Sequence, residues 1–170
     1  HFATSVLHIV IHIKIGVKLL NIIGADKKDE VISKEVAAII ANNRLKLNDA
    51  EFLTSIGKID EAEEYLFQRA EQLDGRFYTG LLSLAKTMES EGRNLAASII
   101  YRSLLSSVLE RGYTKAYPHG IRYLKKLDKL AASISDWNTF DDHKEFKDDI
   151  YEAHGRKRSF WSKYKVKSSG

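Results

Sequence analysis

Residues 95–110 read LAASIIYRSLLSSVLE, and this stretch decides the fold. Its apolar residues recur at intervals of three and four, which is the period of an α-helix rather than of a strand. They cover so wide a face that a helix formed here must contact neighbours on several sides. Gly112 then supplies a residue type that ends helices. The stretch therefore predicts the central helix of an all-α fold.

The same periodicity predicts six further helices around the central one. They span residues 31–42, 48–56, 60–73, 77–91, 118–134 and 141–153. Asn48 and Asp60 are predicted N-caps, each with a glutamate three residues later. Pro118 occupies a first-turn position, where a missing amide hydrogen has no consequence. With the N-terminal segment included, we expect about seven to eight helices.

Residues 6–18 fit two structures. Leu7, Ile9 and the following odd-numbered residues alternate with His8, His12 and other polar or small residues, which is typical of a strand. A helix that buries Val6, Ile9 and Ile13 fits almost as well. We favour the helix because a lone strand would have no pairing partner elsewhere in the chain.

Two segments 35 residues apart share a pattern, Gly57-Lys-Ile-Asp-Glu-Ala62 and Gly92-Arg-Asn-Leu-Ala-Ala97. In each, a helix-ending glycine is followed five residues later by a small alanine, a spacing typical of repeats. The pattern resembles tetratricopeptide helical hairpins, and the resemblance implies a right-handed, solenoid-like stack of antiparallel hairpins. Arg69 and Asp74 depart from that motif, and no third copy follows Arg111, so a regular array is not expected.

Three further stretches resemble the C-terminal part of an uncharacterised bacterial helical family. The three stretches are Ala97-Ser-Ile-Ile-Tyr-Arg-Ser-Leu-Leu, Lys115-Ala-Tyr-Pro-His-Gly-Ile-Arg-Tyr-Leu and His154-Gly-Arg-Lys-Arg-Ser-Phe-Trp161. Some relatives in that family carry a SWIM-type zinc finger. The resemblance implies an all-helical fold and a prokaryotic origin, but no activity. No zinc role transfers, because the finger's cysteines are absent.

Length and composition limit the number of domains and the location that we expect for the chain. The chain has 170 residues, no cysteine and one proline, so we expect a single helical domain over residues 1–155 and a reducing, cytoplasmic location. It starts with histidine, from which we expect that upstream residues are missing. The uncharged stretch before Lys14 is shorter than the roughly 20 residues of a membrane span, so no membrane partner is expected.

The net charge of +4 is concentrated at the C-terminus, in residues 156–170. This basic aromatic tail contains the candidate interaction residues Arg156, Lys157, Arg158, Phe160, Trp161, Lys163 and Tyr164. Such a mixture can contact phosphates and stack on bases. In the alternative interpretation, Phe160 and Trp161 fold back to close the core, and the cations lie opposite acidic residues 141–152.

A second candidate site is a polar pocket at which Arg102, His119, Arg122 and Tyr123 converge. Tyr101, Tyr117 and Tyr123 are also predicted as core aromatics. His8 and His12 have the spacing of a two-histidine metal pair but no third ligand nearby, so no metal is expected. The acidic residues Asp141, Asp142, Glu145, Asp148 and Asp149 are interpreted as a solvated helix face.

No catalytic motif is recognisable: the sequence lacks a nucleophile elbow, a phosphate loop, a dinucleotide fingerprint and a His-Glu-x-x-His motif. We therefore expect no cofactor and no enzymatic activity. The leading hypothesis is a helical-repeat module that binds an unknown protein or peptide. Nucleic-acid binding by the tail is the alternative, and self-association into a homo-oligomer is a further possibility.

Overall fold

The computed structural model describes residues 25–166, and this part of the chain is all-α, as predicted. The hydrophobic segment 6–18, with His8 and His12, lies outside the described residues. The α-helices are α2 (Ala25–Ala41), α3 (Leu47–Ser55), α4 (Ile59–Phe67), α5 (Tyr78–Ser90), α6 (Asn94–Arg111), α7 (Tyr117–Ala131), α8 (His143–His154) and α9 (Arg158–Val166). Two short 3₁₀ helices are η1 (Ala70–Gln72) and η2 (Thr114–Ala116). Among the described helices, none has an apolar stretch long enough to cross a bilayer.

The chain divides into two compact units, residues 1–44 and residues 45–170. Helix α2 is the described element of the first unit. It begins six residues before the predicted start at Val31, because charged residues with good helix propensity precede the first apolar position. Helices α3 to α9 form the second unit, which contains both the groove and the basic surface described below.

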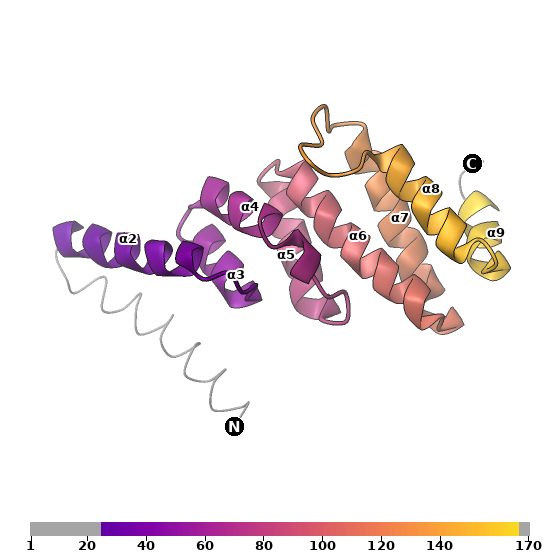
Figure 1. The fold of residues 1–170 in the computed structure, drawn as a ribbon, viewed down its shortest axis with the longest axis horizontal. Coiled ribbons are helices and arrows are strands. Elements are labelled where there is room, and N and C mark those ends of the chain that lie inside the picture. The colour runs from indigo at the N-terminus through magenta and orange to yellow at the C-terminus, as the bar shows by residue number, and fades with distance from the viewer. Residues whose placement is uncertain (1–24, 167–170) are drawn as a thin grey trace, which may run out of the picture. The chain divides into compact units, whose positions relative to one another are not determined.

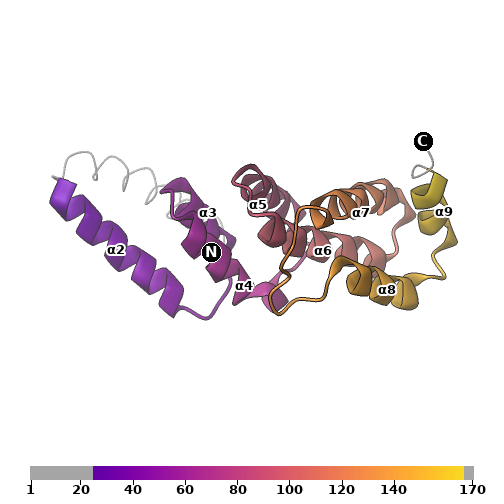
Figure 2. The same ribbon diagram turned by 90° about the horizontal axis from the view of Figure 1, so that it is seen from above.

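Helix α6 is the centre of the second unit, as its sequence predicts. It packs against α5, α7, α4 and α8, and it buries eleven of its 18 residues. Figure 1 shows α5, α6 and α7 side by side, with α8 and α9 at the C-terminal end, and Figure 2 shows the same order from above. The three tyrosines predicted in the core, Tyr101, Tyr117 and Tyr123, are all buried.

The two turns that carry the sequence pattern have the same geometry. Gly57 and Gly92 adopt φ angles of 78° and 73°, a left-handed conformation that side chains disfavour. In both turns the amide of the residue after the glycine donates to a carbonyl five residues earlier, which is the helix-ending pattern of a Schellman motif. These bonds are 2.8 Å long and join Lys58 to Leu53 and Arg93 to Met88.

The predicted N-caps are wrong. Helices α3 and α4 start one or two residues earlier than expected, so their N-cap positions hold Lys46 and Lys58, which make no side-chain cap. A full capping box occurs instead at α8, where the Asp142 carboxylate accepts from the Glu145 amide at 2.8 Å. The Glu145 carboxylate accepts from the Asp142 amide at 2.9 Å. Part of the acidic segment therefore stabilises the start of α8.

The C-terminal segment folds onto the core, as in the alternative interpretation of the tail. Residues 158–166 form α9, which packs against α7, so the predicted division at residue 155 does not separate them from the fold. Phe160 is 0% exposed and Trp161 is 7% exposed. The prediction that these two rings are available to stack on a ligand is therefore wrong. Gly120 makes this packing possible, because a side chain there would meet the Phe160 ring.

Candidate functional site

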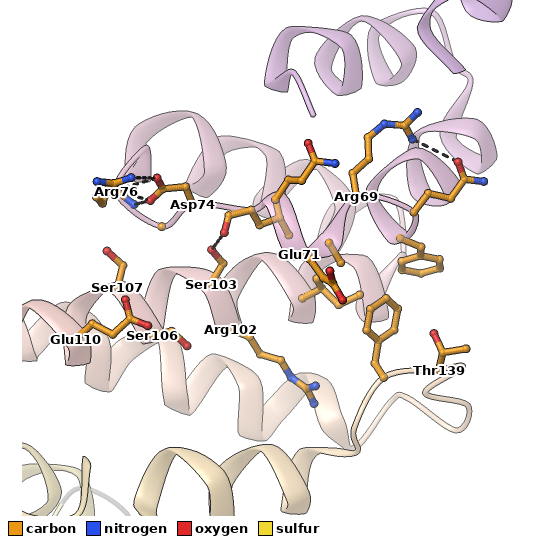
Figure 3. A pocket seen from close by; sticks show the side chains of 18 of the residues that line it. Arg69, Glu71, Asp74, Arg76, Arg102, Ser103, Ser106, Ser107, Glu110 and Thr139 are labelled. Carbon is orange, nitrogen blue, oxygen red and sulfur yellow. Dashed lines mark hydrogen bonds and ion pairs between the residues drawn. The ribbon is translucent and has the colours of Figure 1, made fainter. Parts of the chain in front are cut away.

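An open groove of about 1010 Å³ runs beside α6. One wall is the connection between α4 and α5, residues 67–76, and the floor is one face of α6 from Ile99 to Arg111. Residues 139–140, in the loop before α8, close one end. Figure 3 shows serine and charged side chains of the wall and the floor around this space. Because it is formed by three separate segments of the chain, the groove depends on how they pack.

The wall formed by residues 67–76 is fixed to α6 by close backbone contact. The hydroxyl of Ser103 donates to the carbonyl oxygen of Leu73 at 3.0 Å. Gly75 lies so close to α6 that an added Cβ would clash with the Ser103 carbonyl oxygen and lie 2.7 Å from the Ser107 Cβ. Beyond it, the Arg76 guanidinium donates to the Asp74 carboxylate, and these bonds lower the pKa of that carboxyl. This wall is therefore a closely fitted part of the unit.

The floor of the groove presents hydrogen-bonding groups at helical spacing. Ser103, Ser106, Ser107 and Glu110 lie three or four residues apart on α6, so they follow one face of the helix (Figure 3). At the end closed by residues 139–140 the lining becomes apolar, where the rings of Phe67 and Phe140 lie 5.5 Å apart between centroids. The arrangement suits an extended ligand that has polar groups along its length and an apolar group at one end.

Arg102 joins the floor of the groove to the loop before α8. Its guanidinium lies between the rings of Trp137 and Phe146, 4.7 and 4.6 Å from their centroids, and donates to the Asp141 carbonyl oxygen at 2.8 Å. Burial lowers the pKa of Arg102 to about 10, against the opposing effect of the nearby carboxylates of Asp141 and Asp142. Stacking on two rings stabilises a cation in such a position, so Arg102 holds the loop in place.

The structure does not bring the predicted polar pocket together. His119 and Arg122 are exposed on α7, where their side chains are 2.6 Å apart. Tyr123 is buried and its ring lies 6.0 Å from that of Tyr101, while Arg102 contacts the loop before α8. Neighbouring helical residues point about 100° apart, so Arg122 and Tyr123 cannot share one pocket. Sequence proximity alone was therefore a poor guide here.

A polar network that the sequence analysis missed links α7, α8 and α9. The Asp128 carboxylate lies 2.8 Å from the His143 ring, 3.0 Å from the Lys147 ammonium and 2.7 Å from the Tyr164 hydroxyl. Burial raises the pKa of Asp128, but the hydrogen bonds from His143, Tyr164 and Lys147 outweigh it and lower the pKa overall. Tyr164, predicted as an interaction residue, instead takes part in this network. No motif marks it, because its members lie up to 36 residues apart.

We expect Asp128→Asn to lower the free energy of unfolding by about 1–2 kcal/mol at pH 7, because it removes a partly buried, hydrogen-bonded charge. The folded-state pKa lies below the ordinary value of 3.8, so the carboxylate stabilises the fold above pH 3.8 and loses this effect as the pH falls through the folded-state pKa. Urea denaturation at several pH values should show the difference from the unmodified chain shrinking below that point. Asp148→Asn, at an exposed pair with Lys144, is the control and should change little. Equal effects of the two variants would contradict the network's importance.

Among the described residues, no group of three or more His, Cys, Asp or Glu side chains could hold a metal ion. Four candidate interaction residues lie in or beside α9, namely Arg156, Lys157 and Arg158 at its start and Lys163 in its last turn. All except the half-buried Lys157 are exposed. They remain accessible to a ligand although Phe160 and Trp161 do not.

No curated protein and no solved structure matches the sequence significantly. A family model matches residues 28–163, about four fifths of the chain, and the family is described as one of unknown function, DUF6880. This match agrees with the resemblance to an uncharacterised helical family, and it includes the lining of the groove and, except for Tyr164, the Asp128 network. The chain therefore belongs to the family of unknown function DUF6880.

Proposed function

We propose that the chain is a non-catalytic helical-repeat module that binds an extended segment of another protein in the groove beside α6. The observation that carries this proposal is the groove itself: it is open, formed by three chain segments, and lined by hydroxyl and charged groups with an apolar end. Grooves of helical-repeat proteins are used in this way to bind peptides.

The repeat is supported by burial as well as by turn geometry. Residues that correspond at the 35-residue spacing occupy equivalent environments, since Ala50 and Ala85 are both 0% exposed, as are Ala62 and Ala97. Helix α3 packs against α5, and α4 packs against α6, so the second hairpin lies on the first. This is the arrangement expected of two tetratricopeptide-like hairpins, in which small residues allow paired helices to approach closely.

The lining also indicates the kind of peptide. The Ser106 hydroxyl can donate or accept hydrogen bonds, and the carboxylates of Glu110 and Glu71 can accept them, from a peptide backbone or from polar side chains. Ile99 and the paired rings of Phe67 and Phe140 offer a site for one apolar side chain. We therefore expect a segment with one large apolar residue at one end of an otherwise polar stretch.

A displayed peptide library tests the proposal on the full chain. Peptides enriched on the unmodified chain should bind Ser106→Arg at least about tenfold more weakly, because the larger side chain fills the groove. Ser83→Arg is the matched control, since Ser83 is an exposed serine within α5 and does not line the groove. This control should bind like the unmodified chain. If no peptide is enriched, or if both variants bind equally, the proposal is wrong.

A further inference from the structure

A concentration of unpaired cations lies at the end of α6, in η2 and the first two turns of α7, and at the connection between α8 and α9. In the described residues none of them forms an ion pair, whereas Lys126, Lys144 and Lys147 on α7 and α8 each contact a carboxylate. We call this group the basic end. It consists of Arg111, Lys115, Arg122, Arg156, Lys157 and Arg158.

Folding brings these cations together from two parts of the sequence. The Lys157 ammonium lies 3.4 Å from the position that a Cβ on Gly112 would occupy, just after the end of α6. The Phe160 ring packs edge-on against Tyr117, at 5.5 Å between centroids, so the start of α9 lies against the start of α7. Figure 1 shows the end of α6 and the connection between α8 and α9 at the same end of this unit.

The charge of this surface is not explained by the stability of the fold. Like charges placed close together repel. Arg111 is favoured in the last turn of α6 by the helix dipole, but the exposed positions of Lys115, Arg156 and Arg158 impose no requirement for a cation. Burial and Lys157 lower the pKa of His154 in this region, and Glu110 opposes them, so Glu110 lies near the basic end. Glu152, four residues before Arg156, is a second acidic residue close to it in the sequence. Two carboxylates do not neutralise six cations, so the surface remains positively charged.

An exposed aromatic ring lies within this surface. Tyr113 is 64% exposed, and the Arg111 guanidinium lies 5.4 Å from its ring centroid. Proteins that bind single-stranded nucleic acid combine cations, which contact the phosphates, with exposed rings on which the bases stack. Tyr113 can supply the stacking surface that the buried Phe160 and Trp161 cannot.

We propose that the basic end binds single-stranded nucleic acid, with its cations on the phosphate backbone and Tyr113 stacked on a base. An anionic membrane fits the surface less well, because membrane-binding surfaces place exposed apolar side chains beside their cations. Here the large apolar rings of α9 are buried. The basic end adjoins the groove at Arg111, but its other five cations do not line the groove. Variants of those five therefore test this proposal without changing the groove.

Fluorescence anisotropy tests the proposal with a labelled single strand of about 20 nucleotides, measured on the full chain between about 50 and 300 mM salt. The test variant replaces Lys115, Arg156, Lys157 and Arg158 with glutamine and leaves Arg111, which also lines the groove, unchanged. The matched control removes the same charge elsewhere, by replacing Lys27, Lys28, Lys34 and Lys86, which have no ion pair in the described structure. Circular dichroism checks that both variants are folded.

We expect the test variant to bind roughly 30-fold more weakly at low salt and to lose about three units of slope in the dependence of log affinity on log salt. The control should behave like the unmodified chain. Tyr113→Ala should weaken binding about five- to tenfold with an unchanged slope, because stacking is not ionic. A single charge reversal, Arg158→Glu, should also weaken binding. It replaces the variant with four substitutions as the test if that variant does not fold.

Three results would overturn the proposal. The first is no binding by the unmodified chain at low salt, and the second is an equal loss in the matched control. The third is binding to vesicles that contain about 30% phosphatidylserine without binding to the single strand, which would assign the surface to membranes instead.

Discussion

Phe160→Ala is expected to lower the free energy of unfolding by about 3–4 kcal/mol, the range for truncating a fully buried phenylalanine. The Phe160 ring is 0% exposed and makes edge-to-face contacts with Tyr117 and Trp161, at 5.5 and 5.1 Å between centroids. Its removal leaves a cavity beside Gly120, which has no side chain to fill it. Domains of this size are stable by only about 5–15 kcal/mol, so the loss is a large fraction of the total. Urea denaturation followed by circular dichroism measures it.

Two further variants test whether the loss of stability is caused by lost packing in the core. Phe160→Leu keeps most of the volume and should cost about 1–1.5 kcal/mol, so it remains measurable if the alanine variant does not fold. Phe77→Ala removes the same side chain at a position that is 66% exposed and should cost less than about 1 kcal/mol. If Phe160→Ala and Phe77→Ala were equally mild, α9 would not belong to the cooperative unit.

The fold could be predicted from the sequence where hydrophobic periodicity and turn chemistry agree. The wide apolar face of residues 95–110 correctly predicted the central helix, and Gly57 and Gly92 correctly predicted helix ends. Residues 158–166 were predicted as a tail, because their cations obscured the helical spacing of Phe160, Trp161 and Tyr164. A short helix of this kind is stabilised by tertiary packing, which local sequence does not reveal.

The candidate sites were harder to predict than the fold. The groove depends on a glycine, Gly75, whose importance arises from its contact with two residues of α6, Ser103 and Ser107, about 30 positions later in the chain. The basic residues of the tail were visible in the sequence, but their proximity to Arg111 and Lys115 required the packing of α9 on α7. Surfaces composed of distant segments carry no motif, since no spacing along the chain is fixed by the ligand.

Gly75→Ala is expected to lower the free energy of unfolding by about 2–3 kcal/mol and to weaken peptide binding in the groove. The added methyl group would meet the backbone carbonyl of Ser103 on α6, which cannot move without disturbing the helix. The wall of the groove around Leu73 must therefore shift away, and the hydrogen bond from the Ser103 hydroxyl to the Leu73 carbonyl is weakened. Urea denaturation and the peptide-binding assay measure the two effects.

Gly57 provides the matched control, because it is required for a different reason. Nothing lies within 4 Å of a Cβ placed there, but its φ of 78° disfavours alanine. Gly57→Ala should cost about 1 kcal/mol, and Gly57→Asn less, because asparagine adopts this conformation more readily. Gly75→Asn should be at least as damaging as Gly75→Ala, since the obstacle at Gly75 is space rather than backbone conformation. If the asparagine variant were more stable than the alanine variant at both Gly57 and Gly75, backbone conformation would be the obstacle at both positions. That result would contradict the close contact between residues 74–76 and α6, and with it the proposed origin of the groove wall.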